Sequence, residues 1–253
     1  MNSKREKIGF IVQARMGSTR FPGKVLKPFC EGTVLEYLVR RLKNAFEGIP
    51  IIIATSVEKN DDQIVNLLMS DEKVAVFRGN ECDVLDRFVK CAKMYELRKF
   101  VRVCADNPFL DIDGLRSLVD IMSDKDVDYV SYFIEDVPTI KTHFGLWAEG
   151  VSLDALERVQ RGTSAKKYLE HVTNYIYENS DLFKIERLSI PDWFPKHSPI
   201  RMTMDTENDY ASLRYVCGQF NCGDVSLQRL VQIVENDEVL LNNMRKEILL
   251  NKK

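Results

Sequence analysis

Short runs of β-branched and other apolar residues alternate with longer segments of helical periodicity along the first half of the chain. The apolar runs predict buried strands at residues 8–14, 50–55, 74–77, 100–104 and 128–131. Between them, apolar residues recur at helical spacing in residues 34–45, 61–69, 83–95 and 112–122. Strands that alternate with helices in this way form a mostly parallel, twisted sheet with helices on both faces. The pattern therefore predicts the α/β fold class.

The rhythm of the pattern changes after about residue 135. We expect helices at residues 152–161, 164–179, 208–217, 226–236 and 239–253, and strands at residues 183–188 and 200–204. No internal repeat, low-complexity segment or linker divides the chain. We therefore predict a single domain over residues 1–253, in which residues 135–200 form a small α+β lobe inserted into the sheet domain.

The composition allows a large core and argues against two classes of partner. Apolar residues make up 45% of the 253 residues, and the net charge is −2. A dedicated nucleic-acid binder usually carries a basic excess, so we expect no nucleic-acid partner. No apolar run reaches the length of a signal-peptide core or a membrane span, which predicts a cytoplasmic protein without membrane contact. The six cysteines have neither Cys-x-x-Cys nor zinc spacing, and we expect reduced thiols.

A cationic segment that contains glycine follows the first predicted strand. Residues 13–24 read Gln-Ala-Arg-Met-Gly-Ser-Thr-Arg-Phe-Pro-Gly-Lys. Arginine and lysine bind phosphate oxygens, and glycine lets backbone amides approach an anion. A Walker A loop does not fit, because five residues separate Gly17 from Gly23 and Val25 stands where Ser or Thr would contact magnesium. The composition predicts a loop that binds a polyphosphate, with an ordinary surface turn as the alternative.

Six segments in register resemble the cytidylyltransferase-like family, which includes spore coat polysaccharide biosynthesis cytidylyltransferases and is related to the CMP-Kdo and CMP-acylneuraminate synthetases. The resemblance covers roughly residues 8–216. The segments are residues 15–24 (RMGSTRFPGK), 54–56 (ATS), 78–87 (RGNECDVLDR), 102–108 (RVCADNP), 170–173 (EHVT) and 201–209 (RMTMDTEND). The family implies a Rossmann-like nucleotidyltransferase fold of the GT-A type, CTP as substrate, and a homodimer formed through the lobe at residues 135–200.

The resemblance also implies roles for individual residues. It places CTP against Ala14, Arg15, Met16, Gly17, Ser18, Arg20, Lys24, Arg78, Ala105 and Asp106, and it gives catalytic roles to Lys24, Arg15, Asp106 and Asp205.

Asp106 and Asp205 are the implied ligands of Mg²⁺. Magnesium prefers few carboxylates together with phosphate oxygens and water. Each aspartate follows a predicted strand, and ligands of such sheets bind beyond the carboxyl ends of the strands. The alternatives are a loop or capping aspartate before Pro108 for Asp106 and a helix N-cap for Asp205.

Two departures from the family pattern concern the substrates. Cys104 and Ala105 precede Asp106 where the CMP-Kdo relatives carry Gln-Gly, and that glutamine reads cytosine, so the nucleobase stays open. Trp147 replaces an aspartate that lies near the acceptor in the family. Trp147 can stack on a ring or an acyl group, or it can simply pack in the core.

The implied acceptor-binding residues are Trp147, Glu149, Glu170 and His171. For His171, a packed structural role is the favoured alternative. The Asp-x-Asp sequence at residues 111–113 mimics a glycosyltransferase metal motif, but its place before a helix favours capping.

The sequence thus predicts a cytidylyltransferase that moves CMP from CTP to a small sugar or sugar acid, with release of pyrophosphate, in the synthesis of a surface polysaccharide or glycan. The alternatives are a glycosyltransferase that consumes a nucleotide-sugar, transfer to a phosphate or phosphonate acceptor that is not a sugar, a different nucleobase, and a catalytically silent nucleotide-binding protein.

Overall fold

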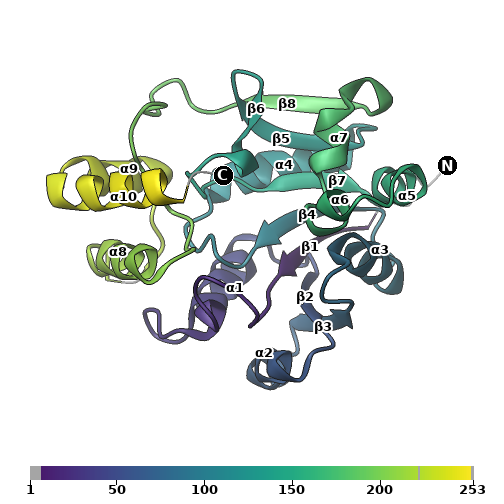
Figure 1. The fold of residues 1–253 in the computed structure, drawn as a ribbon, viewed down its shortest axis with the longest axis horizontal. Coiled ribbons are helices and arrows are strands. Elements are labelled where there is room, and N and C mark those ends of the chain that lie inside the picture. Colours follow the sequence, from purple (N-terminus) through teal and green to yellow (C-terminus); the bar gives the residue numbers. More distant parts are fainter. Residues whose placement is uncertain (1–6, 222, 252–253) are drawn as a thin grey trace.

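The computed structural model describes residues 7–221 and 223–251 of the chain. Its centre is an eight-stranded sheet of order β3-β2-β1-β4-β7-β5-β6, with β8 also paired to β5 (Figure 1). Strands β1 to β4 run parallel, β7 runs antiparallel to β4 and β5, and β8 runs parallel to β5. The strands are β1 (Ile8–Gln13), β2 (Ile51–Ser56), β3 (Val74–Gly79), β4 (Lys99–Cys104), β5 (Tyr129–Ile134), β6 (Val137–Pro138), β7 (Glu149–Ser152) and β8 (Ile185–Ser189). The predicted, mostly parallel sheet is confirmed.

The helices begin where the sequence supplies caps. Thr33 and Thr206 form capping boxes, and the side chains of Asp83, Asp111 and Ser152 each accept a bond from a first-turn amide. The helices are α1 (Val34–Ala45), α2 (Asp62–Leu68), α3 (Val84–Met94), α4 (Ile112–Asp124), α5 (Leu153–Gly162), α6 (Lys166–Glu170), α7 (Asn174–Glu178), α8 (Glu207–Gly218), α9 (Leu227–Glu235) and α10 (Glu238–Leu250). The capping interpretation of the Asp-x-Asp sequence is confirmed.

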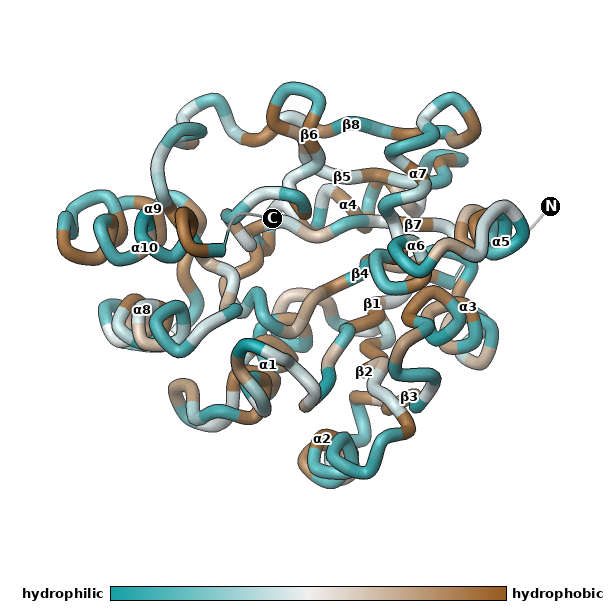
Figure 2. Tube along the Cα trace, viewed as in Figure 1, coloured by the Kyte–Doolittle hydropathy of each residue, from teal (hydrophilic) through white to brown (hydrophobic). Residues whose placement is uncertain are grey.

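The central strands separate two hydrophobic cores. Because successive side chains of a strand point to opposite faces, Phe10 and Val12 pack with α1 and α4, whereas Ile11 packs with α3 and α5. Strands buried on both faces read as continuous apolar runs, which is why the sequence located them. Hydrophobic residues dominate β1 and β4, while most connecting loops are hydrophilic (Figure 2). Helices α8, α9 and α10 gather at one end of the molecule (Figure 1).

Two predicted elements differ from the structure, and β6 and β7 are additional strands. The helix expected at residues 164–179 is two short helices, because the chain turns at 171–173 and the Thr173 hydroxyl bonds to Glu149 in the sheet. The strand expected at residues 200–204 does not join the sheet. It crosses the end of β4 instead, where Met202 N donates to Phe144 O and Met204 N donates to Asp106 O.

The cysteine prediction is wrong for one pair. Cys30, in the loop before α1, and Cys217, near the end of α8, form a disulfide. Their separation of 187 residues leaves no local signal in the sequence. Cys82, Cys91 and Cys104 form no disulfide among the described residues, and burial raises the pKa of the Cys91 thiol to about 12. Across the described ranges, no helix is both long and apolar enough to cross a membrane.

Candidate active site

The cationic segment folds into a tight loop at the carboxyl end of β1. The carbonyl oxygen of Met16 accepts bonds from the amides of Ser18 and Gly23, at 2.9 and 3.0 Å. Gly23 has a φ of 69°, a left-handed conformation that glycine adopts without strain. Phe21 anchors the loop in the core with 3% of its surface exposed. Internal hydrogen bonds and a buried side chain therefore hold the loop in a defined conformation, unlike an ordinary surface turn.

Asp61 fixes this loop to the neighbouring strand. Its Oδ1 accepts a 2.7 Å bond from Met16 N, and its Oδ2 accepts bonds from the Thr55 hydroxyl and the Ser56 amide. Burial of the Asp61 carboxyl raises its pKa, but the bonds from Ser56, Met16 and Thr55 outweigh this effect and lower the pKa below 3.8. The loop thus rests on an ionised, fully hydrogen-bonded carboxylate.

Lys24 joins the loop to both predicted metal ligands. Its Nζ lies 2.8 Å from Asp106 Oδ2 and 3.4 Å from Asp205 Oδ1, and it donates to Met204 O at 2.6 Å. Burial lowers the pKa of Lys24, but the charges of Asp106 and Asp205 outweigh burial and raise it above 10.5. Two carboxylates that are 99 residues apart in the sequence therefore meet around one ammonium group.

A buried ion pair holds the turn that carries Asp205. Arg201 Nε and Nη2 donate to the two carboxylate oxygens of Asp209 at 2.7 and 2.9 Å, and Nη2 also reaches Asp205 Oδ2 at 3.1 Å. Asp209 in turn accepts the amides of Asp205 and Thr206. Thr206 caps α8, so the alternative of Asp205 as the helix N-cap does not apply. The paired bonds fix the orientation of the Asp205 side chain.

The two arginines of the loop also face carboxylates. Arg20 Nη2 lies 3.2 Å from Asp205 Oδ1, and Arg15 Nη2 lies 3.8 Å from Glu170 Oε1. Both guanidinium side chains are partly exposed. Like Lys24, they are therefore paired with carboxylates of their own chain.

The donor set fits a divalent cation that arrives with a phosphate ligand. No cluster of three or more His, Cys, Asp and Glu side chains suited to a metal occurs within residues 7–221 and 223–251. Two carboxylates suffice for Mg²⁺ when substrate phosphates and water complete its coordination. The position between Asp106 and Asp205 already holds the Lys24 ammonium, so it accepts positive charge.

Beside this cation site lies a cavity of about 610 Å³ that contains Arg20 and Asp106. Its other walls come from β4, the segment 139–147 and α7. The remaining lining residues are Arg102, Cys104, Asn107, Thr139, Ile140, Lys141, Thr142, Gly145, Trp147, His171, Asn174, Tyr177 and Thr203. Of the predicted acceptor residues, Trp147 and His171 line this cavity. Trp147 is also packed against Tyr132 and Phe194, so its ring both lines the cavity and packs in the core.

The two predicted acceptor glutamates, Glu149 and Glu170, are not among the residues that line this cavity. Glu149 is fully buried, where it accepts a 2.6 Å bond from Arg102 Nη1 and further bonds from Tyr129 and Thr173. Glu149 is the first residue of β7 and lies opposite Arg102 of β4 in the sheet register, which brings its carboxylate to the Arg102 guanidinium. Glu170 is exposed and faces Arg15.

The remaining predicted nucleotide residues flank the loop. Ala105 is buried and donates its amide to Gln13 O. Arg78, at the end of β3, donates to Ser56 O and Glu58 O and pairs with Asp62 at 2.6 Å. Its guanidinium thus braces the ends of β2 and β3, and the strands β2 and β1 lie between β3 and β4.

Comparison with known proteins decides the family. A family model described as cytidylyltransferase matches residues 9–246. The chain belongs to the cytidylyltransferase family. As a cytidylyltransferase it is a CTP-dependent nucleotidyltransferase, and members of the family typically use a divalent metal.

Two relatives and one solved structure illustrate the likeness. An uncharacterized protein of Methanocaldococcus jannaschii is 36% identical over 93% of this chain and 93% of its own length. The spore coat polysaccharide biosynthesis protein SpsF of Bacillus subtilis is 36% identical over 81% of this chain and 84% of its own length. A cytidylyltransferase structure from Leptospira borgpetersenii has a TM-score of 0.82 and 28% identity, and the match covers 94% of this chain and 98% of that one.

The sequence interpretation gave no role to several residues that build this cytidylyltransferase site. Arg201, Asp209 and Arg102 stand at the ends of family-like segments, and Asp61 follows another, so the motifs contained a signal for them. Arg87 is fully buried, and its Nη1 donates to Asn80 O. Burial and the nearby Arg15 lower the pKa of Arg87 to about 10. The sequence does not reveal the partners of these five residues, because each contact joins distant segments or depends on how a loop folds.

Proposed function

We propose that this enzyme transfers CMP from CTP to a sugar or sugar-acid acceptor and releases pyrophosphate, with Mg²⁺ as its metal. The observation that carries the proposal is the position of Lys24 Nζ, 2.8 Å from Asp106 and 3.4 Å from Asp205. It joins a loop of phosphate-binding composition to a carboxylate pair suited to magnesium. The triphosphate and the metal would share this point.

The roles of the residues follow from charge and position. Arg15, Arg20 and Lys24 exchange their carboxylate partners for triphosphate oxygens and stabilise the charge that develops on the departing pyrophosphate. Asp106 and Asp205 would hold Mg²⁺, which would neutralise phosphate charge and lower the pKa of an acceptor hydroxyl. The acceptor oxygen attacks the α-phosphorus in line, the bond to the β-phosphate oxygen breaks, and the hydroxyl proton passes to solvent. The protein contributes mainly positioning and charge.

The cavity beside the cation site supports a polyhydroxylated, anionic acceptor. Lys141, which lies 3.9 Å from its partly exposed partner Glu178, supplies positive charge, and Thr142 and Asn174 supply polar groups. Asn107 Oδ1 and Thr139 Oγ1 are buried without a hydrogen-bond partner among the described residues, and an unpaired buried polar atom costs about 1–3 kcal/mol. Both residues line the cavity, where an acceptor could supply the missing partners. Trp147 offers an apolar wall for a ring or acyl group.

The setting of the enzyme is a further part of the proposal. Likeness to a spore coat polysaccharide biosynthesis protein supports a role in making a surface polysaccharide. We place the reaction in the cytoplasm. We also propose a homodimer formed through residues 135–200, because the edge strand β8 in this lobe has exposed positions at Arg187 and Ser189 and unpaired edges favour association.

The test is pyrophosphate release from CTP, UTP, GTP and ATP with Mg²⁺ and a panel of sugars, sugar acids and phosphorylated alcohols. We expect release with CTP and a sugar or sugar-acid acceptor. Release only with phosphorylated alcohols would replace the proposed sugar acceptor by a phosphorylated alcohol. Release only with another nucleotide would replace cytosine by the base of that nucleotide. Binding of CTP without release, or consumption of a nucleotide-sugar with release of a nucleoside diphosphate, would contradict the proposal.

A further inference from the structure

The last helix, α10, ends at the active site. Its residue Glu247 keeps only 5% of its surface exposed although it belongs to a surface helix. Glu247 and Asn251 lie just beyond residues 9–246, the part of the chain that the family model matches. Their contacts are therefore features of this chain that the family comparison leaves unassigned.

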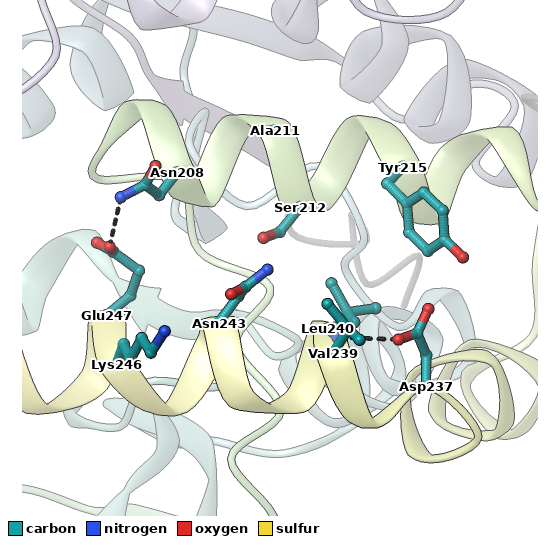
Figure 3. A pocket seen from close by; sticks show the side chains of 10 residues that line it. All are labelled: Asn208, Ala211, Ser212, Tyr215, Asp237, Val239, Leu240, Asn243, Lys246 and Glu247. Carbon is teal, nitrogen blue, oxygen red and sulfur yellow. Dashed lines mark hydrogen bonds between the residues drawn. The ribbon is translucent and has the colours of Figure 1, made fainter.

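Glu247 binds the start of α8. Its Oε2 accepts the Thr206 hydroxyl at 2.8 Å, and its Oε1 accepts Asn208 Nδ2 at 2.8 Å, the bond drawn in Figure 3. A cavity of about 640 Å³ separates α8 from α10 along much of their length. The bond between Asn208 and Glu247 bridges the two helices at one end of this cavity (Figure 3). Asn208 follows the turn that carries Asp205 in the first turn of α8.

Asn251 connects the same helix end to the cationic loop at residues 13–24. Its Nδ2 donates to Glu247 Oε2 at 3.2 Å, and its Oδ1 accepts Arg20 Nη1 at 3.0 Å. The other terminal nitrogen of Arg20 faces Asp205. The end of α10 thus contacts both halves of the site, the loop through Arg20 and the carboxylate turn through Thr206.

We propose that Glu247 and Asn251 are positioning residues, through which α10 sets the orientation of Arg20 and of the turn at residues 204–206. This inference rests on the proposed function. With Asn251 holding Nη1 of Arg20, Nη2 remains available to leave Asp205 for a phosphate oxygen. Glu247 fixes the Thr206 hydroxyl, which caps α8 and accepts the Asp209 amide. A carboxylate accepts several donors at once, whereas a glutamine at this position would offer one oxygen and lose an acceptor.

The first experiment measures backbone amide hydrogen exchange in Glu247→Gln. The amides of Asp205, Thr206 and Asp209 are bonded within the turn, so we expect faster exchange at residues 205–209 than in wild type. The matched control is Arg245→Ala on the same helix, whose guanidinium bonds to Asn242 in the exposed part of α10. Unchanged exchange at residues 205–209 in Glu247→Gln would overturn the link between α10 and the turn.

The second experiment measures the Kd of CTP with Mg²⁺ in Asn251→Ala by calorimetry. Loss of one orienting bond to Arg20 should weaken binding by about 3- to 10-fold, with an unchanged melting temperature and an unchanged Kd in Arg245→Ala. A lowered melting temperature with unchanged affinity would assign Asn251 a purely structural role and overturn the inference. If wild type itself does not bind CTP, the proposed function fails, while the exchange measurement still decides the coupling of α10 to the turn.

Discussion

At the scale of single residues, each cation of the loop at residues 13–24 that is proposed to bind phosphate pairs with a carboxylate. Lys24, Arg15 and Arg20 each face a carboxylate of their own chain, so a triphosphate bound as proposed would replace existing ion pairs instead of filling an uncompensated cationic pocket. Lys24 is the most constrained of the three, because its ammonium is buried between two carboxylates. These ion pairs connect the loop to Glu170, Asp205 and Asp106.

Replacement of Lys24 by methionine tests this role. Lys24→Met keeps the length of the side chain but removes the charge that would face the phosphates, so we expect kcat/KM for CTP to fall by about 10²-fold or more. Pyrophosphate release measures the effect. Lys27→Met, a lysine at the end of the same short turn, is the matched control and should retain activity within a few-fold. Similar losses in the two variants would contradict a specific role for Lys24.

At the scale of elements, the outcome of the sequence interpretation follows from where each signal lies. Helix α1 was predicted at residues 34–45 and has those bounds, because its periodicity and the Thr33 cap are local. The segment 200–204 looked like a strand, yet its partners are residues 106 and 144, which no local pattern reveals. For the same reason the motifs located the loop and both aspartates, but they did not identify the Asp61 anchor or the burial of Glu149.

Asp61 provides a test of how the elements support the loop. Asp61→Asn cannot accept all the bonds that Met16, Thr55 and Ser56 donate, and we expect a loss of about 1–3 kcal/mol in the free energy of unfolding. Urea unfolding measures this change. Asp62→Asn, an exposed neighbour that pairs with Arg78, is the control and should change stability by less than about 1 kcal/mol.

The pH dependence of the same variant has a definite sign. The pKa of Asp61 is lowered in the folded state, so its ionised form stabilises the fold above 3.8, and this stabilisation is lost as the pH falls through the folded pKa. The stability difference between wild type and Asp61→Asn should therefore be constant at neutral pH and shrink below pH 3.8. A difference that grows on acidification would show that the carboxylate is not the stabilising form.

At the scale of the whole molecule, one buried ion pair joins the two halves of the sheet. Arg102 on β4 belongs to the parallel half, and Glu149 on β7 belongs to the antiparallel half. The pair lies under the candidate acceptor cavity, which Arg102 lines. Its geometry therefore affects both the stability of the sheet and the placement of an acceptor.

Glu149→Gln should destabilise the protein by about 3–5 kcal/mol, because it leaves the buried Arg102 guanidinium without its counter-charge. Thermal or urea unfolding measures the loss. The double variant Glu149→Gln with Arg102→Met removes the unpaired charge and should recover part of the stability. A double variant less stable than Glu149→Gln alone would contradict this account.

The central claim is that the cationic loop and the two aspartates share one triphosphate through a divalent ion. Its most direct test is the Kd of CTP measured by calorimetry with and without Mg²⁺ in wild type, Asp106→Asn and Asp205→Asn. We expect Mg²⁺ to tighten CTP binding to wild type and this gain to disappear in both variants. Retention of the full magnesium-dependent gain in either folded variant would contradict it.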